Sequence, residues 1–273
     1  VQAALEALTA GDNGVAVESL LARDGDEPVA EEWQDRYKQG ARLYWDYFYE
    51  EKTVNFFKDR HYLREEFVEL MPAEVLVDPR RWVEPLHSED TSSPSYPFCA
   101  VEGRLVVLEV GCAVGNGILP LLRANPRIFG LACDLSAVAV KLLTEKEEYR
   151  CGRCLAFPCD IARPAEEQPT LEHKALEDVV PEGTVDFTTL LFVLSAIDPS
   201  MHRQVIARLR GRLRPGGLAL VRDYGRGDLA QLRFAPGHWL GGDLYVRGDG
   251  TLALFLTAEG LIANFEAEGF ETV

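Results

Sequence analysis

The segment LVVLEVGCAVGN, residues 105–116, decides the fold of this chain. Its first half is apolar except for Glu109, which is typical of a strand buried on both faces of a parallel sheet. Gly111 and Gly115 follow, with Ala113 between them, where the chain turns toward the next helical pattern. Small residues at such a turn let a bound nucleotide lie against the backbone. The segment therefore predicts a nucleotide-binding turn between a strand and a helix.

Outward from this segment, strand and helix patterns alternate along residues 104–273. This alternation predicts a Rossmann-like α/β fold, in which helices cover both sides of a mostly parallel sheet. Ser136 is placed to cap the second helix, because its hydroxyl can accept a hydrogen bond from the first turn. The further strands are expected at 128–133, 155–159, 185–194 and 218–223, and the helices at 115–124, 136–149, 171–179 and 199–213.

Residues 225–256 interrupt the alternation with scattered glycines and two short apolar runs, 244–246 and 252–256. The runs flank a Gly-Asp-Gly turn, which predicts a β-hairpin inserted after the fifth strand. In that place the hairpin would cover a pocket at the carboxyl ends of the strands. A last helix is expected at 258–268 and the start of another strand after it. A full seven-stranded sheet is therefore expected to need residues beyond 273.

Two acidic residues sit where bound nucleotides meet a sheet of this kind. Asp134 ends the second strand and Asp160 closes the third. The carboxyl ends of parallel strands meet at one edge of the sheet, where ligands bind. We therefore expect Asp134 to accept hydrogen bonds from ribose hydroxyls and Asp160 to accept one from an adenine amino group.

The chain before the sheet divides into two parts. Residues 1–30 are rich in Ala, Gly and Asp and are expected to form a loosely packed extension. Residues 31–98 are aromatic and charged, with helical spacing in their first part, and predict a helical lid that ends in a Pro- and Ser-rich linker. The nucleotide-binding domain would occupy residues 99–273. The aromatic stripe at 44–57 would equally fit a helix face that packs on a core.

The composition is that of a soluble globular protein, with 47% hydrophobic and 26% charged residues. No apolar run is long enough to span a membrane, and the start of the chain, which is Val rather than Met, lacks the pattern of a signal peptide. The six cysteines do not form a disulfide scaffold, so reduced thiols and a cytoplasmic location are expected, with the nucleus as the alternative. One Cys-x-x-Cys pair at 151–154 is too little to predict a metal site, and we expect none.

The formal net charge of −16 argues against a surface that binds nucleic acid throughout. Arginines gather between residues 203 and 233, however, and either form a local basic face or cover one side of a helix. The acidic balance favours a protein partner that supplies part of any RNA affinity.

The pattern from Glu109 to Gly115 resembles the cofactor-binding region of class I methyltransferases, which bind S-adenosylmethionine. Ala113 stands where that family has its middle glycine, which puts the cofactor affinity in question. Dinucleotide oxidoreductases share the glycine turn, but Glu109 and the segment LRPGG at 213–217 favour a methyltransferase. The absence of an N-P-P-[FY] motif argues against methylation of the exocyclic amine of adenine.

Further segments resemble, in order, the eukaryotic methyltransferase-like enzymes that make N3-methylcytidine in tRNA. The resemblance covers residues 33–273 and implies methyl transfer to N3 of a cytidine at position 32 of the anticodon loop, with S-adenosylhomocysteine as the product. The variant FFKDRH at 56–61 is most similar to the branch that acts on serine tRNA, which makes seryl-tRNA synthetase the expected partner. The matching segments are YWDYFY at 44–49, NFFKDRHYLREEF at 55–67, LFVLSAI at 191–197, RDYG at 222–225, LRF at 232–234 and YVRGDGT at 245–251.

The resemblance also implies roles for single residues. Trp45 and Tyr49 would close over the cofactor, and Asp223 would be catalytic where the target base enters, with a structural role as its alternative. The other residues expected to bind cofactor are Glu109, Gly111, Ala113, Gly115, Asp134, Leu135, Asp160, Ile161 and Leu191. The residues expected to face RNA are Phe57, Lys58, Arg60, His61, Phe192, Tyr224, Arg233 and Arg247.

Two other functions stay open on the sequence. A class I methyltransferase of a protein or small molecule would share the cofactor turn, and activity indifferent to Lys58, Arg60 and His61 would favour it. A scaffold that binds cofactor without turnover would fit Ala113, and cofactor binding without transfer to any tRNA would favour that function. Cys159 is not expected to act as a nucleophile, because it ends a strand beside the expected adenine ligand.

Overall fold

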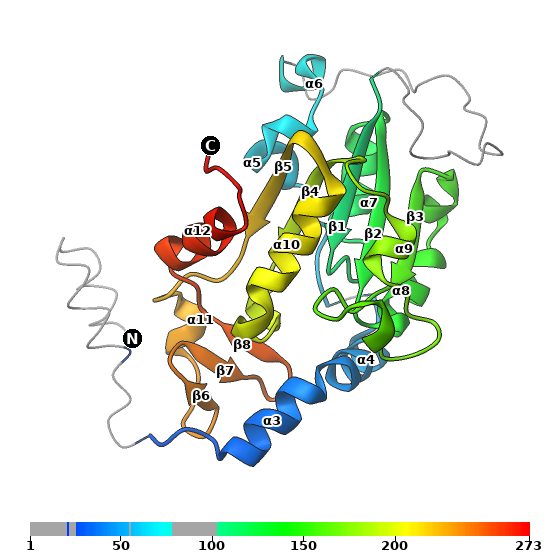
Figure 1. The fold of residues 1–273 in the computed structure, drawn as a ribbon. Coiled ribbons are helices and arrows are strands. Elements are labelled where there is room, and N and C mark those ends of the chain that lie inside the picture. The colour runs from blue at the N-terminus through cyan, green and yellow to red at the C-terminus, as the bar shows by residue number, and fades with distance from the viewer. Residues whose placement is uncertain (1–20, 22–25, 55, 78–102) are drawn as a thin grey trace.

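The computed structural model describes residues 21, 26–54, 56–77 and 103–273. Their centre is a five-stranded parallel sheet with the order β3-β2-β1-β4-β5 (Figure 1). The chain winds from β1 outward to β2 and β3, and then returns to the other side of β1 for β4 and β5. Ligands of such sheets bind outside the carboxyl ends of the strands at this reversal. The strands are β1 (Leu105–Val110), β2 (Ile128–Asp134), β3 (Cys154–Pro158), β4 (Val185–Leu191) and β5 (Leu213–Arg222).

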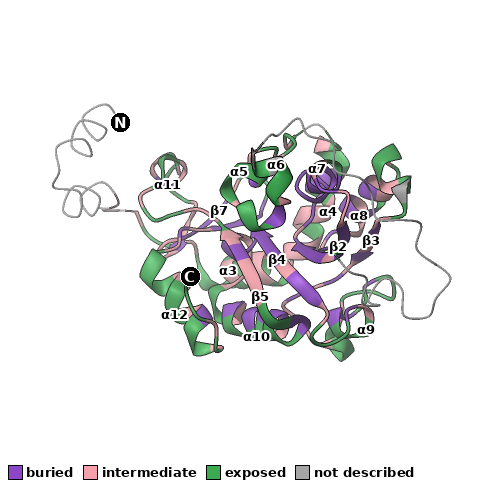
Figure 2. Ribbon diagram, turned by 90° about the horizontal axis from the view of Figure 1, so that it is seen from above, coloured by how far each residue is buried: buried purple, intermediate pink, exposed green. Residues whose placement is uncertain are grey.

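The central strands are buried on both faces, which explains their continuous apolar sequence. On β1, Val106 and Leu108 belong to one core cluster, whereas Val107 belongs to the cluster on the opposite face. Figure 2 shows the buried residues along the central strands and the exposed residues on the outer sides of the helices. The first cluster includes side chains of α9 (Leu176–Val179), α10 (His202–Arg212) and α12 (Ala258–Ala267), and the second includes side chains of α7 (Ile118–Ala124) and α8 (Ala137–Thr144).

The predicted parallel strands are all present, with some shifted ends. β4 ends at Leu191 rather than at residue 194, because Phe192 takes a left-handed φ of 60° and ends the extended chain. β5 begins at Leu213 rather than at residue 218, and the Pro-Gly-Gly segment at 215–217 bulges out of it where the register with β4 shifts.

The predicted helices are shorter than their patterns. Ser136 caps α8 as predicted, since its hydroxyl accepts a hydrogen bond from Ala139 N at 3.2 Å. α7, α8 and α9 occupy only 118–124, 137–144 and 176–179. In the described part of the chain no strand follows α12 and the parallel sheet has five strands, so the seven-stranded sheet stays a prediction.

The insertion after β5 forms three antiparallel strands, which confirms the predicted hairpin and adds one strand to it. β6 (Trp239–Gly241), β7 (Leu244–Val246) and β8 (Leu252–Leu254) pair in this order, and α11 (Leu229–Leu232) precedes them. The hairpin contributes its own small apolar cluster, and Tyr37 packs against that cluster from the N-terminal region.

Two N-terminal helices join this hairpin to the Rossmann-like core (Figure 1). α3 (Glu31–Gln39) carries Tyr37, and α4 (Ala41–Lys52) packs against α8. Gly250, with a φ of 85°, lets the ring of Tyr44 lie against the β7–β8 turn, because a Cβ there would be 2.3 Å from the ring. α5 (Leu63–Glu66) and α6 (Ala73–Val77) follow, and Leu63 of α5 is buried in the same core cluster as α7.

Most of the predicted extension at 1–30 and the whole linker at 84–98 lie outside the described residues. At the described end of the extension, Val29 N donates a hydrogen bond to Trp239 O at 2.8 Å. Of the helices within the described ranges, none has the length and apolar character needed to cross a membrane.

Candidate active site

A cavity of about 430 Å³ opens at the carboxyl ends of the central strands. Its size lies within the range of roughly 300–1,000 Å³ that is typical of small-molecule sites. The turns after the parallel strands, α4 with the segment after it, and the β7–β8 turn together form its walls. The predicted site residues that line it are Trp45, Tyr49, Phe57, Lys58, Arg60, Gly111, Ala113, Asp134, Leu135, Asp160, Ile161, Leu191, Phe192, Tyr224 and Arg247.

The turn after β1 contains three residues with left-handed φ angles. Gly111 has 63°, Ala113 has 51° and Gly115 has 87°. A Cβ on Gly111 would lie 2.6 Å from Val193, and one on Gly115 would lie 2.4 Å from Leu143, so both positions require glycine. Gly111 and Ala113 line the cavity, whereas Gly115 does not and instead lets the turn pack on α8.

Asp134 fixes this turn from the end of β2. Its Oδ2 accepts a hydrogen bond from Ala113 N at 2.8 Å, and its Oδ1 accepts one from Ser136 N at 2.8 Å. Burial raises the pKa of the carboxyl to about 6, although the two backbone hydrogen bonds oppose this shift. Each carboxylate oxygen has more than one acceptor site. Asp134 can therefore hold the turn and still accept hydrogen bonds from a ribose.

Glu109 lies in β1 before the turn and does not line the cavity, so its contact with the cofactor stays a prediction. Its Oε2 accepts a hydrogen bond from Ile118 N at 2.7 Å, at the start of α7. Gly117 leaves room for the carboxylate, since a Cβ there would lie 1.9 Å from Oε1. Burial raises the pKa of Glu109 to about 7. The acid of the motif is thus a buried hydrogen-bond acceptor at the start of α7.

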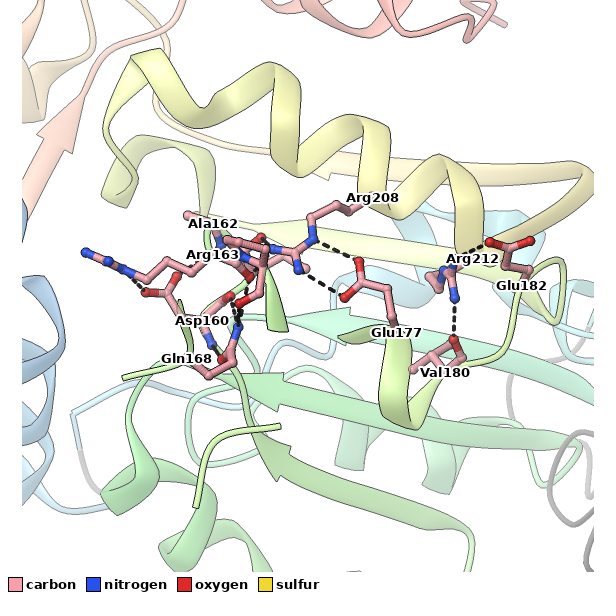
Figure 3. A network of polar contacts seen from close by, with 11 residues as sticks. Asp160, Ala162, Arg163, Gln168, Glu177, Val180, Glu182, Arg208 and Arg212 are labelled. Carbon is pink, nitrogen blue, oxygen red and sulfur yellow. Dashed lines mark hydrogen bonds and ion pairs between the residues drawn. The ribbon is translucent and has the colours of Figure 1, made fainter. Parts of the chain in front are cut away.

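The wall after β3 is held from outside by a polar network (Figure 3). Asp160 N donates to Gln168 Oε1 at 2.9 Å, and Gln168 Nε2 donates to Asp160 O at 3.0 Å. Arg208 of α10 donates to Ile161 O at 3.0 Å and binds both carboxylate oxygens of Glu177 at 2.9 and 3.0 Å. Burial raises the pKa of the Asp160 carboxyl. The backbone at 160–161, where the adenine was predicted to bind, is therefore fixed by side chains outside the cavity.

α4 forms an aromatic lid over the cavity. The ring of Tyr49 lies 5.9 Å from that of Trp45 and 5.2 Å from that of Phe48, measured between centroids. Burial raises the pKa of Tyr49 well above its ordinary value, so its hydroxyl stays protonated. Asp46 fastens the lid, because its Oδ1 accepts a hydrogen bond from Ser136 Oγ at 2.7 Å. The aromatic stripe thus packs as a cluster and lines the cavity at once.

The other end of the cavity is built from two aromatic rings and two arginines. Phe192 and Tyr224 follow β4 and β5, and their ring centroids are 5.0 Å apart. The guanidinium carbon of Arg60 lies 5.3 Å from the centre of the Phe192 ring, and that of Arg247 lies 5.5 Å from the centre of the Tyr224 ring. The left-handed φ of Phe192 is the kind of backbone strain that clusters at functional sites. Flat rings flanked by cations suit the stacking of an unpaired base.

The other residues predicted to face RNA divide into two groups. Phe57 and Lys58 line the cavity mouth beside Arg60. Arg60 points inward, since its Nη1 donates to the carbonyl at the end of β4 at 3.0 Å. His61 and Arg233 are exposed and do not line the cavity. Contact of these two residues with RNA stays a prediction.

Asp223 does not line the cavity, although its neighbour Tyr224 does, and its catalytic role stays a prediction. Its Oδ2 accepts a hydrogen bond from Ser195 N at 3.0 Å, and its Oδ1 accepts one from Tyr224 N at 2.9 Å. Burial raises the pKa of this carboxyl, while the same hydrogen bonds oppose the shift. Asp223 therefore holds the backbone on which the aromatic end of the cavity is built.

The sequence analysis did not identify several residues that build or line the cavity. Asn116 holds the segment after α4 to the core, since its Nδ2 donates to Phe57 O at 3.0 Å. His173 Nε2 lies 2.8 Å from Leu135 O and secures the end of β2. Asp249 and Thr251 reach the cavity from the β7–β8 turn. The Gly-Asp-Gly turn was the available signal for these last two, but a turn signal does not say which side chain points inward.

Comparison with known proteins agrees with this site. Residues 108–219 match a family model described as a methyltransferase domain. The solved structure of 1,6-didemethyltoxoflavin-N1-methyltransferase from Burkholderia thailandensis, with bound S-adenosylhomocysteine, superposes with a TM-score of 0.52 at 17% identity, over 91% of this chain and 83% of that chain. The fold is therefore that of the class I methyltransferases, and residues 108–219 match a methyltransferase domain.

Two relatives narrow the class. The tRNA N(3)-cytidine methyltransferase METTL2 of Danio rerio is 38% identical over 91% of this chain and 70% of that protein. The tRNA N(3)-cytidine methyltransferase METTL6 of Mus musculus is 38% identical over 88% of this chain and 73% of that protein. The chain belongs to the family of tRNA N(3)-cytidine methyltransferases.

The residues of the cavity fit the cofactor of this family, S-adenosylmethionine. Gly111 and Ala113 present bare backbone, and the carboxylates of Asp134 and Asp160 lie at the ends of neighbouring strands. Trp45 and Tyr49 cover them from the lid. The described residues contain no group of three His, Cys, Asp or Glu side chains that could hold a metal ion.

Proposed function

We propose that this protein transfers the methyl group of S-adenosylmethionine to N3 of a cytidine in tRNA. The observation that carries the proposal is that one cavity has two unlike ends. Gly111, Ala113 and Asp134 suit a nucleoside cofactor at one end, and the paired rings of Phe192 and Tyr224 suit a flat base at the other. A single cavity of this kind brings a methyl donor and an acceptor base into contact.

Methyl transfer to N3 of cytosine requires the protein mainly to position the cofactor and the base. The cofactor supplies a methyl group bound to a positively charged sulfur. N3 of cytosine is neutral at pH 7 and carries an in-plane lone pair, so the new N–C bond can form as the C–S bond breaks, without removal of a proton. The protein must therefore align the base and exclude water.

The base must leave its stack before it can enter the cavity. N3 lies on the Watson–Crick edge, so only an unpaired or outward-turned cytidine exposes it. Stacking on each aromatic side chain contributes about 1–3 kcal/mol toward that extrusion. A cytidine in the anticodon loop, at position 32, meets this requirement with little pairing to break.

Primer extension tests the proposal. The full chain is incubated with S-adenosylmethionine and tRNA, and reverse transcriptase then stops at an N3-methylated cytidine, because the methyl group blocks pairing. We expect one stop, at position 32. Tyr224→Ala should lower kcat/KM roughly 10- to 100-fold, whereas Tyr47→Ala, which removes an exposed ring of α4 outside the cavity lining, should not. Cofactor binding without any stop, on every tRNA tested, would remove the proposal.

The tRNA species and the partner are narrower proposals. The segment FFKDRH at 56–61 motivates serine tRNA, and the net charge of −16 motivates help from seryl-tRNA synthetase in the cytoplasm. Binding to serine tRNA, measured with and without the synthetase, tests both. Tighter binding in its presence is expected, and equally tight binding by the lone chain would remove the partner. A chain found only in the nucleus of intact cells would overturn the location.

A further inference from the structure

Asp249 lies in the cavity wall at the turn between β7 and β8, and none of the roles assigned above includes it. Arg247 and Thr251 of the same turn also line the cavity. Arg247 stacks its guanidinium over Tyr224, so the turn borders the aromatic end of the cavity. Asp249 therefore lies on the side of the base rather than on the side of the cofactor.

The turn that carries Asp249 is held in one conformation. Arg247 N donates to Thr251 O at 2.8 Å, and Gly250 N donates to Arg247 O at 2.9 Å. Gly250 has a φ of 85° and packs against Tyr44 of the lid. Asp249 uses one oxygen in the turn, since its Oδ1 accepts hydrogen bonds from Thr251 N at 3.0 Å and from Thr251 Oγ1 at 2.7 Å.

The second oxygen of Asp249, Oδ2, makes no hydrogen bond with the described residues. The cavity has two other acidic residues, Asp134 and Asp160. Both Asp134 oxygens accept backbone hydrogen bonds, and Asp160 accepts one and pairs with Arg163 at 3.1 Å. Among the described residues that line the cavity, Asp249 is thus the carboxylate that borders the aromatic end and keeps a free acceptor oxygen.

Cytosine carries a donor beside its reacting atom. Its 4-amino group lies next to N3, and after methylation part of the positive charge of the ring resides on that amino group. A carboxylate that accepts a hydrogen bond from this group binds the base and binds it more strongly as charge develops. Uracil presents an acceptor oxygen at the same place, which a carboxylate repels.

We propose that Asp249 selects cytosine by accepting a hydrogen bond from its 4-amino group and stabilises the charge that methylation creates there. This inference rests on the proposed methylation of cytidine in tRNA and adds the residue that reads the base. The Thr251 hydrogen bonds aim the carboxylate, and the contact between Gly250 and Tyr44 fixes the turn against the lid.

A cycle of protein and base changes tests the inference. The substrates are one tRNA with cytidine or with its 4-desamino analogue, pyrimidin-2-one, at the target position. On cytidine, Asp249→Asn should lower kcat/KM roughly 10- to 100-fold, the range for one lost charge-assisted hydrogen bond. On pyrimidin-2-one, which keeps N3 but lacks the amino group, wild type and Asp249→Asn should react at the same rate.

Controls separate this role from a structural one. Asp249→Asn should leave the Kd of S-adenosylhomocysteine, measured by calorimetry, unchanged. Asp243→Asn removes a carboxylate from the same insertion that binds Arg226 and Gln231 outside the cavity, and it should keep the wild-type rate. An equal loss of kcat/KM for Asp249→Asn on cytidine and on pyrimidin-2-one would overturn the inference. Such a loss would show that the substitution disturbs the turn and does not remove a contact with the amino group.

The wild-type enzyme alone also decides the question. If it methylates the pyrimidin-2-one substrate as fast as cytidine, Asp249 reads no amino group, whatever the variants do. If it methylates neither substrate, the proposed function itself fails. If it methylates cytidine and Asp249→Asn does so equally well, only the role of Asp249 fails.

Discussion

Ala113 places a side chain where the backbone favours glycine. Its φ of 51° lies in the left-handed region, and its amide donates the hydrogen bond to Asp134 that closes the cofactor turn. For an L residue this conformation costs roughly 1–2 kcal/mol. A glycine would remove this cost, but the greater flexibility of glycine in the unfolded chain would offset part of the stabilisation. The turn in this chain is therefore strained at the residue that departs from the family pattern.

Ala113→Gly should raise the free energy of unfolding by about 1 kcal/mol, because the strain disappears. It should also tighten cofactor binding, since the turn reaches its bound conformation more easily. Chemical denaturation and calorimetry with S-adenosylhomocysteine measure the two effects. Ala113→Val is the opposing variant and should destabilise the protein, since a β-branched side chain tolerates this φ poorly. A glycine variant less stable than wild type would contradict the strain.

Glu109 makes the fold sensitive to pH. Burial raises its pKa in the folded protein to about 7, from 4.5, so folding disfavours its charged form. The stability that Glu109 contributes is fully present below pH 4.5 and is lost as pH rises through about 7. Glu109→Gln keeps an acceptor for Ile118 N and removes the charge.

The glutamine variant should therefore be more stable than wild type at pH 8, by an amount of the order of 3 kcal/mol. The difference should shrink as the pH falls and vanish below pH 4.5, where Glu109 is protonated in both the folded and the unfolded protein. Urea denaturation of both proteins across this range measures it. A constant difference at all pH values would show that folding does not shift the pKa of this carboxyl.

At the scale of elements, α10 positions the cofactor wall after β3 without touching the cavity. Arg208 reaches from this helix to Ile161 O and Glu177 (Figure 3), and a guanidinium can make these bonds together where an ammonium cannot. Arg208→Lys should raise the KM for S-adenosylmethionine about tenfold, the effect of roughly 1.4 kcal/mol, and leave kcat and the affinity for tRNA unchanged.

The matched control lies on the same helix. Arg203 forms a surface ion pair with Glu268 at 2.8 Å and is 63% exposed, so Arg203→Lys should change none of these quantities. Initial rates over a range of cofactor concentrations separate KM from kcat. A fall in kcat with an unchanged KM for Arg208→Lys would contradict its role in positioning the wall.

Across the whole molecule, the features that depend on a few neighbouring residues, such as buried strands and a helix cap, could be predicted from the sequence. The buried runs of β1 and β2, the cap at Ser136 and the acid at the end of β2 follow from burial on both faces and from backbone geometry, and the structure confirms them. Glu109 and Asp223 do not line the cavity, and their direct roles stay predictions, because their orientation depends on how the ends of neighbouring strands fold over them.

The missed residues share one physical reason. Asp249 lies far from the cofactor turn in the sequence, and only the packing of Gly250 on Tyr44 brings its turn to the cavity. The left-handed φ of Phe192 likewise comes from tertiary structure, since nothing in the sequence marks an aromatic residue for that conformation. Long-range placement of this kind leaves no periodic signal.

The central claim is that one cavity aligns a methyl donor with the N3 lone pair of a cytidine. The most direct measurement is mass spectrometry of nucleosides from tRNA that has been incubated with the purified chain and S-adenosylmethionine labelled in the methyl group. The account predicts labelled 3-methylcytidine as the new nucleoside. Labelled 5-methylcytidine, or a methylated purine in its place, would contradict it.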